Sequence, residues 1–212
     1  MCEEYIYHHR RAAGKLLAEK LALIVGNKPV ILSLPKGGAI IGSEVAKVLN
    51  AEHDLVICRK IGAPYNPEVA IGALTQDGKL IKNDVTIDVL AVTKGYLESQ
   101  IKRELKEIER QLSVFRGDKL FPDLLNKTVV LADDGLATGF TMEAAVEFTR
   151  RLNPSRIIVG VPVGSVEAIT RLKPKVDQVV CPLIPKKLWA VGQYYQNFHQ
   201  VKDEEVKKLF QS

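Results

Sequence analysis

Several absences narrow the classes to which this 212-residue chain can belong. Its three cysteines, Cys2, Cys58 and Cys181, include no C-x-x-C pair, so the sequence predicts neither a disulfide framework nor a zinc cluster. No apolar run approaches the roughly 18 residues that a membrane-spanning helix needs. The first residues also lack the basic and apolar regions of a secretory signal peptide. Together these absences predict a cytoplasmic protein that does not contact the membrane.

Two common phosphate-binding patterns are also missing. The chain contains neither G-x-x-x-x-G-K-[ST] nor G-x-G-x-x-G, so NTPase and dinucleotide-binding functions lose support. Its four histidines lack metal-ligand spacing, and we expect them on surfaces or helix caps: His8, His9, His53 and His199. The composition, 46% hydrophobic and 26% charged, is ordinary for a globular enzyme. The net charge of +5 is compatible with a polyanionic partner but does not choose among nucleic acid, membrane and a phosphorylated small molecule.

Strand-like and helix-like segments alternate along the chain. This alternation predicts an α/β fold, with a mainly parallel sheet flanked by helices, in which ligands bind at the carboxyl ends of the strands. We expect a core over residues 1–181 and a small C-terminal hood over residues 182–212. Buried strands are predicted at 30–34, 54–58, 69–74, 128–132, 156–163 and 176–181, and helices at 10–24, 39–49, 93–115, 141–152 and 165–172.

The segment from Val129 to Thr141 carries the strongest chemical signal. A strand delivers two adjacent carboxylates, Asp133 and Asp134, and a glycine-containing loop then leads into a helix. Backbone N–H groups at a helix N-terminus can cradle a phosphate. Ionised carboxylates suit the vicinal hydroxyls of a ribose or a hydrated metal ion. A solvated acidic turn is the simpler alternative, but it leaves the coincidence of these features unexplained.

This thirteen-residue pattern resembles the motif with which type I phosphoribosyltransferases bind 5-phosphoribosyl-1-pyrophosphate (PRPP). The resemblance implies that Asp133 and Asp134 are catalytic, hold the ribose diol, and contact Mg²⁺ indirectly through Mg-PRPP. It implies transfer to a nitrogen nucleophile, a nucleobase-like small molecule, with release of pyrophosphate, and a homodimeric assembly. The PRPP 5′-phosphate would be bound by Ala137, Thr138, Gly139, Phe140 and Thr141.

Two further loops resemble parts of the same family. The first is the pyrophosphate loop, and family analogy places a cis peptide between Pro35 and Lys36. The second contains the basic pair Arg59 and Lys60, followed by a mobile catalytic loop over 61–68 that two prolines keep irregular. Taken alone, these are a glycine turn and a charged strand end. By the resemblance, pyrophosphate would be bound by Pro35, Lys36, Gly37, Gly38, Arg59 and Lys60, with Lys60 also catalytic.

The region that would bind the acceptor departs from the purine-salvage pattern. The segment around Trp189 resembles the family's hood, which implies that Trp189 stacks on a base with Val191 beside it. Enzymes acting on 6-oxopurines carry a general-base acid where this chain has Ala137, and a hood aspartate where it has Gln196. Hypoxanthine and guanine are therefore disfavoured. The closer likeness, over nearly the whole chain, is to predicted phosphoribosyltransferases whose acceptor is unassigned.

Two other functions remain open from the residues. A PRPP- or nucleotide-sensing regulator could use the same fold, since fold does not fix function. Against a nucleic-acid partner, the chain has no recognisable helix-turn-helix or basic arm. A Rossmann-like protein that binds another phosphate, such as a sugar phosphate, is the third alternative.

Overall fold

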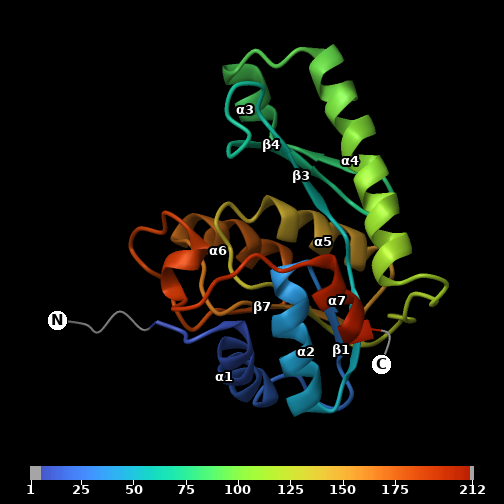
Figure 1. Ribbon diagram of the computed structural model, residues 1–212, viewed down its shortest axis with the longest axis vertical. Coiled ribbons are helices and arrows are strands. Elements are labelled where there is room, and N and C mark those ends of the chain that lie inside the picture. Colours follow the sequence, from blue (N-terminus) through green and yellow to red (C-terminus); the bar gives the residue numbers. More distant parts are fainter. Residues whose placement is uncertain (1–5, 211–212) are drawn as a thin grey trace.

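The computed structural model describes residues 6–210, so Cys2 lies outside the described residues. Its centre is a five-stranded, all-parallel sheet of order β2-β1-β6-β7-β8, flanked by helices (Figure 1). This confirms the predicted fold class. The strands are β1 (Val30–Ser33), β2 (Glu52–Leu55), β6 (Thr128–Ala132), β7 (Arg156–Gly160) and β8 (Gln178–Val180), and the flanking helices are α1 (Arg10–Ala22), α2 (Gly37–Leu49), α5 (Phe140–Arg150) and α6 (Val166–Leu172).

The central strand β6 is buried on both faces, which explains its continuous apolar sequence. Val130 and Ala132 belong to the cluster formed with α1 and α2. Val129 and Leu131 belong to the cluster formed with α5 and α6. The alternation of side chains along one strand thus builds two cores, one on each side of the sheet.

The predicted strand at 54–58 is only partly correct. The main-sheet strand β2 ends at Leu55, and the apolar residues after it leave the sheet. Val56 still donates its N–H to Ser33 O at 3.0 Å, but the N–H of Ile57 is bonded to the Gln76 side chain at 3.1 Å. The chain is thereby led away from the parallel sheet and into a second one.

The second sheet is antiparallel and has the order β3-β4-β5, with β3 (Arg59–Gly62), β4 (Ala70–Leu74) and β5 (Leu80–Lys82). Together with α3 (Asp84–Val89) and the long α4 (Lys94–Phe115), it extends from the main body (Figure 1). The sequence predicted α4 and β4 but not a separate sheet. Arg59 and Lys60 therefore open β3 instead of ending a strand of the main sheet, and the segment expected to be irregular starts after Gly62.

The C-terminal segment folds back over the core. It contains the short 3-10 helix Val191–Tyr194 and the helix α7 (Asp203–Phe210), which contacts both α2 and α4. Val201 and Val206 are buried in a third apolar cluster with residues of α2, β3, β4 and α4. The boundary between core and hood at residue 182 stays a prediction. Within residues 6–210, no helix has the length and apolar character needed to cross a membrane.

The histidine expectation holds for three residues and is wrong for one. His9 caps α1 by accepting a hydrogen bond from Ala12 N at 3.1 Å, and His8 and His199 are exposed. His53 instead packs inward, 2.7 Å from Ser33 Oγ and 4.6 Å from the Phe210 ring centroid. The reason is that α7 ends against the edge strand β2. Burial is the main cause that lowers the pKa of His53 to about 3.

Candidate active site

The two loops with phosphate-binding signals begin side by side in the middle of the sheet. Strand β1 has β2 on one side and β6 on the other, so the strand order reverses at β1 and creates a topological switch point. Ser33 pairs with Ala132, and Leu34 N donates to Ala132 O at 2.9 Å. Ligands of open α/β sheets bind at such a switch point, outside the carboxyl ends of the strands.

Glycine is required where these loops meet. A Cβ placed on Gly37 would lie 1.9 Å from Asp134 Oδ2, and one on Gly38 would lie 2.8 Å from Ala132 O. Both distances are impossible for real atoms, so only glycine lets the start of α2 approach the acidic pair. The peptide between Pro35 and Lys36 is cis, as the resemblance implied.

The acidic pair occupies a half-buried position at the end of β6. Asp134 N donates to Asp133 Oδ1 at 2.8 Å, and Asp134 Oδ2 accepts from Arg10 Nε at 2.7 Å. Burial raises the pKa of Asp133, and the nearby charge of Asp134 raises it further. Burial also raises the pKa of Asp134, while the Arg10 guanidinium works in the opposite direction. Asp134 is therefore paired with a cation, whereas Asp133 has no such partner within residues 6–210 and its pKa is raised more strongly.

Arg10 is a residue of this site that the sequence analysis missed. Its side chain is 7% exposed, and beyond Asp134 its Nη1 donates to His199 O at 2.9 Å. The guanidinium also lies 3.8 Å from the ring centroid of Phe198. The hydroxyl of Tyr195 donates to Asp134 O at 2.6 Å. The first helix and the C-terminal segment therefore meet at the acidic pair.

The predicted 5′-phosphate loop leads directly into α5. This helix begins at Phe140, one residue earlier than expected, with Gly139 as its N-cap at φ +79°. The first N–H groups of a helix have no carbonyl partner within it, so Phe140 and Thr141 can offer them to an anion. Ala137 and Thr138 are exposed. The structure thus brings the five predicted residues together at a helix N-terminus.

Ser165 holds this loop in place and was also missed from the sequence. Its Oγ donates to Ala137 O at 2.7 Å, and its N–H donates to Leu136 O at 2.9 Å. The same hydroxyl accepts from Ala168 N and caps α6. A serine before a helix is recognisable from sequence as an N-cap. Its hydrogen bond to Ala137 O, 28 positions away, has no sequence pattern and could not be predicted.

Each of the three predicted pyrophosphate-binding cations is in an ion pair with an acid of this chain. The partners come from different places: the C-terminal helix, the loop after β3, and α4. Lys36 Nζ lies 2.8 Å from Asp203 Oδ1, Lys60 Nζ 3.2 Å from Glu68 Oε2, and Arg59 Nε 2.8 Å from Glu104 Oε2.

The two predicted acceptor-contacting residues are placed differently. Val191 lies against the acidic loop, since a Cβ on Gly135 would be 2.5 Å from its Cγ1. Trp189 is 80% exposed and lies at the surface. The structure therefore brings Val191 to the loop that would bind PRPP, and stacking of a base on the exposed Trp189 stays a prediction.

The chemistry of the donor set limits how a metal could bind. Within residues 6–210, no group of three or more His, Cys, Asp or Glu side chains could hold a metal ion. Mg²⁺ usually keeps several waters and is bound by one or two carboxylates together with substrate phosphates. Asp133 and Asp134 fit this shared arrangement with substrate phosphates, and not a metal site built from protein ligands alone.

Comparisons with known proteins agree with the fold described above. The protein TT1426 from Thermus thermophilus is 40% identical, with a TM-score of 0.78 and 97% of each chain covered. AQ2163 from Aquifex aeolicus shares the fold alone, at 13% identity, a TM-score of 0.53, and coverage of 86% of this chain and 78% of that one.

The curated relatives include a protein of Mycobacterium tuberculosis (strain CDC 1551 / Oshkosh) named "Putative phosphoribosyl transferase MT0597". It is 35% identical over 201 residues, which is 95% of this chain and 45% of that protein, so the chain spans less than half of its length. Residues 4–197 match the family described as the phosphoribosyl transferase domain. The chain therefore belongs to the phosphoribosyl transferase domain family.

Proposed function

We propose that this protein transfers the phosphoribosyl group of PRPP to a nitrogen nucleophile and releases pyrophosphate. The contact between Gly37 and Asp134 carries the proposal. It joins a loop suited to pyrophosphate to an acid suited to the ribose diol. The C1–O bond of PRPP lies between those two groups, so a donor held by both loops presents its reactive bond at their junction.

Binding and orientation of the donor are the main tasks of the chain. Asp133 and Asp134 accept hydrogen bonds from the two ribose hydroxyls, and the N-terminus of α5 holds the 5′-phosphate. Because both ends of the sugar are fixed, C1 is already oriented for attack by the acceptor nitrogen. Little translational or rotational entropy then remains to be lost in the reaction itself. The two carboxylates also stabilise positive charge that develops on the ribose as the bond to pyrophosphate lengthens.

The leaving group departs with the electron pair of the broken C1–O bond, and the acceptor nitrogen forms the new bond to C1. Lys36, Arg59 and Lys60 neutralise the charge that accumulates on pyrophosphate. Asp133 and Asp134 would contact Mg²⁺ indirectly, through Mg-PRPP, and the metal would supply Lewis-acid chemistry and a template there. The acceptor proton leaves to solvent.

The acceptor is a nucleobase-like molecule, and Ala137 constrains its chemistry. The methyl side chain of Ala137 cannot remove a proton, so the attacking nitrogen must have an available lone pair at neutral pH. Val191 against Gly135 also narrows the space over the acidic loop. The absence of a general base at Ala137 argues against 6-oxopurines, whose enzymes use an acid at this position.

Pyrophosphate release from Mg-PRPP, measured with a panel of nucleobases and other nitrogen nucleophiles, tests the proposal. We expect release with at least one acceptor and none from Asp134→Asn, which keeps the side-chain volume but lacks the charge. PRPP binding without release for any acceptor would instead support a PRPP-sensing regulator. Tighter binding of ribose 5-phosphate or AMP than of PRPP would contradict both.

A further inference from the structure

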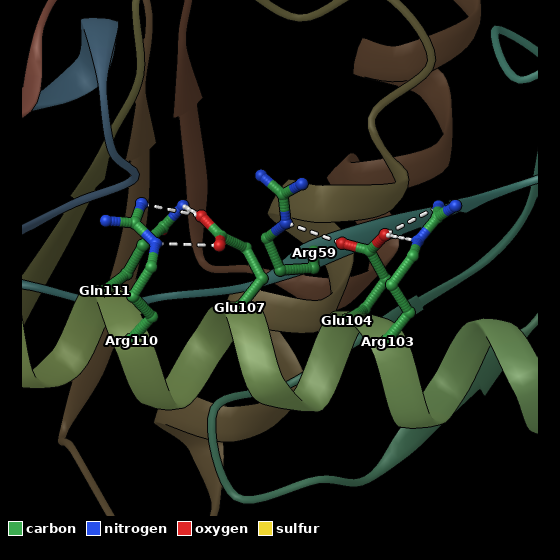
Figure 2. A network of polar contacts seen from close by, with 6 residues as sticks. All are labelled: Arg59, Arg103, Glu104, Glu107, Arg110 and Gln111. Atoms are coloured by element: carbon green, nitrogen blue, oxygen red, sulfur yellow. Dashed lines mark hydrogen bonds and ion pairs between the residues drawn. The ribbon is translucent and has the colours of Figure 1, made fainter.

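Glu104 of α4 is a buried acid that touches one of the predicted pyrophosphate-binding residues. Its side chain is 6% exposed. Its Oε2 accepts from Arg59 Nε at 2.8 Å, and its Oε1 accepts from Arg103 Nε at 3.0 Å and Nη2 at 2.8 Å (Figure 2). A buried carboxylate is costly unless charged partners compensate it. Glu104 is therefore held in one position by two guanidinium groups.

Arg59 meets Glu104 in an unusual way. Arginine–carboxylate pairs are frequently bidentate, with two parallel N–H···O bonds. On the same helix, Arg110 binds Glu107 in this manner, through Nε and Nη2 at 2.8 Å each. Arg59 uses only its Nε, and Figure 2 shows its two terminal nitrogens pointing away from α4. Within residues 6–210, neither terminal nitrogen has a protein hydrogen-bond acceptor.

A guanidinium has five N–H donors, of which Glu104 engages one. The remaining fork has the geometry that suits two phosphate oxygens. The Arg59 side chain is 39% exposed, so a ligand can reach it. Because the single bond to Glu104 fixes the base of the guanidinium, the direction of the fork is set by α4 and not by solvent.

Helix α4 also reaches the pyrophosphate loop. Arg110 Nη1 lies 2.7 Å from Asp203 Oδ2, and the other oxygen of Asp203 lies 2.8 Å from Lys36 Nζ. Glu104 and Arg110 are separated by six residues, which corresponds to about 9 Å along a helix. Helix α4 is thus connected to Arg59 on the small sheet and, through Asp203, to Lys36 in the loop after β1.

We propose that Glu104 is a positioning residue that aims the Arg59 guanidinium at the pyrophosphate of PRPP. The inference rests on the proposed function, because pyrophosphate is the ligand that the fork would meet. Glu104 itself touches no reacting atom. Its effect on the donor passes through Arg59 alone, and this distinguishes positioning from a general contribution to folding.

Glu104→Gln tests the proposal by calorimetric titration with Mg-PRPP and, separately, with ribose 5-phosphate. The variant keeps the size of the side chain and removes its charge. We expect PRPP affinity to fall by about tenfold, the lower end of what loss of an orienting partner costs at metal sites. Ribose 5-phosphate affinity should not change, because that ligand lacks pyrophosphate. An equal loss for both ligands would show a structural role and overturn the proposal.

A double-mutant cycle provides the sharper discrimination. Arg59→Gln should weaken PRPP binding, and adding Glu104→Gln to it should cause no further loss. A further loss in the double variant would mean that Glu104 does not act through Arg59. Glu98→Gln, an exposed acid of the same helix paired with Lys94, serves as the matched control and should bind PRPP like the unmodified protein. Failure of the unmodified protein to bind PRPP would refute the proposed function itself, a result distinct from any outcome of the cycle.

Discussion

Arg10 and Asp134 form a 2.7 Å ion pair across 124 positions of the chain, directly beside the start of α2. The pair ties the first helix to the loop that would bind the ribose diol. It opposes the effect of burial on the pKa of Asp134, and so favours the charged form that can accept two hydrogen bonds. The acid proposed to bind the ribose diol is thereby coupled electrostatically to the first helix of the chain.

Arg10→Gln should weaken PRPP binding, and more strongly at lower pH. Without the guanidinium, the pKa of Asp134 rises further and a larger share of the acid is protonated. Titration calorimetry with Mg-PRPP at about pH 6 and about pH 8 checks this, a range within which raised carboxyl pKa values can titrate. Lys15→Gln, on the exposed side of α1, is the matched control. A loss of affinity equal at both pH values would contradict the electrostatic explanation.

Asp133→Asn should abolish turnover and stabilise the fold. Because its pKa is raised on folding, the folded state binds more protons than the unfolded state between the ordinary value of 3.8 and the raised one. Stability contributed by this group is therefore present at low pH and lost as pH rises through that window. At neutral pH, removing the charge should raise the free energy of unfolding by about 0.5–2 kcal/mol, the range typical of a single stabilising substitution. Denaturant unfolding of both forms measures the difference, and a destabilised variant would contradict the prediction.

Gly37→Ala should eliminate PRPP binding while leaving the chain folded. The new methyl group would overlap Asp134 Oδ2 at 1.9 Å, so the acid must move out of the position set by Arg10. Circular dichroism and PRPP titration separate the two effects. Gly95→Ala is the control, because a Cβ there meets nothing within 4 Å and a helix gains about 0.5–1 kcal/mol from alanine. If Gly37→Ala binds PRPP normally, the close approach of the two loops is not required.

His53 should make the protein lose stability as pH falls. Its pKa drops from 6.5 to about 3 on folding. Between these two pH values, His53 is therefore protonated in the unfolded state and neutral in the folded state. The contribution of neutral His53 is complete above pH 6.5 and declines toward pH 3, and each tenfold difference in proton affinity between the two states is worth about 1.4 kcal/mol. Denaturant midpoints measured across this range should fall less steeply in His53→Asn. Parallel curves for the two proteins would show that another group causes the acid sensitivity.

Local features of the site could be predicted from sequence, and long-range ones could not. The strand, acidic pair, loop and helix from Val129 to Thr141 are contiguous, so their spacing alone indicates a site for phosphate and sugar. The glycines after Lys36 are likewise a local pattern. Arg10 and Tyr195 reach the same acid from both ends of the chain, and nothing in the spacing of an amphipathic helix distinguishes a buried arginine from a solvated one.

The second sheet shows the same limit at the level of the fold. Residues 55–58, which follow Asp54, form one apolar run, which is typical of a single buried strand. The run is divided because a side chain 19 positions later, Gln76, takes the N–H of Ile57. No periodic sequence pattern signals a hydrogen bond of this kind. Beyond it, Arg59 and Lys60 belong to the second sheet and not to the main sheet.

The ion pair between Lys36 and Asp203 gives the proposed pyrophosphate loop a counter-ion from α7. An incoming diphosphate therefore does not meet a bare ammonium group. The diphosphate would have to displace the Asp203 carboxylate, which already neutralises Lys36. The electrostatic gain would then be the difference between the Lys36–diphosphate and the Lys36–Asp203 interactions. Under the proposed function, PRPP binding would therefore be thermodynamically linked to the docking of α7 on the core, because each anion would weaken the binding of the other to Lys36.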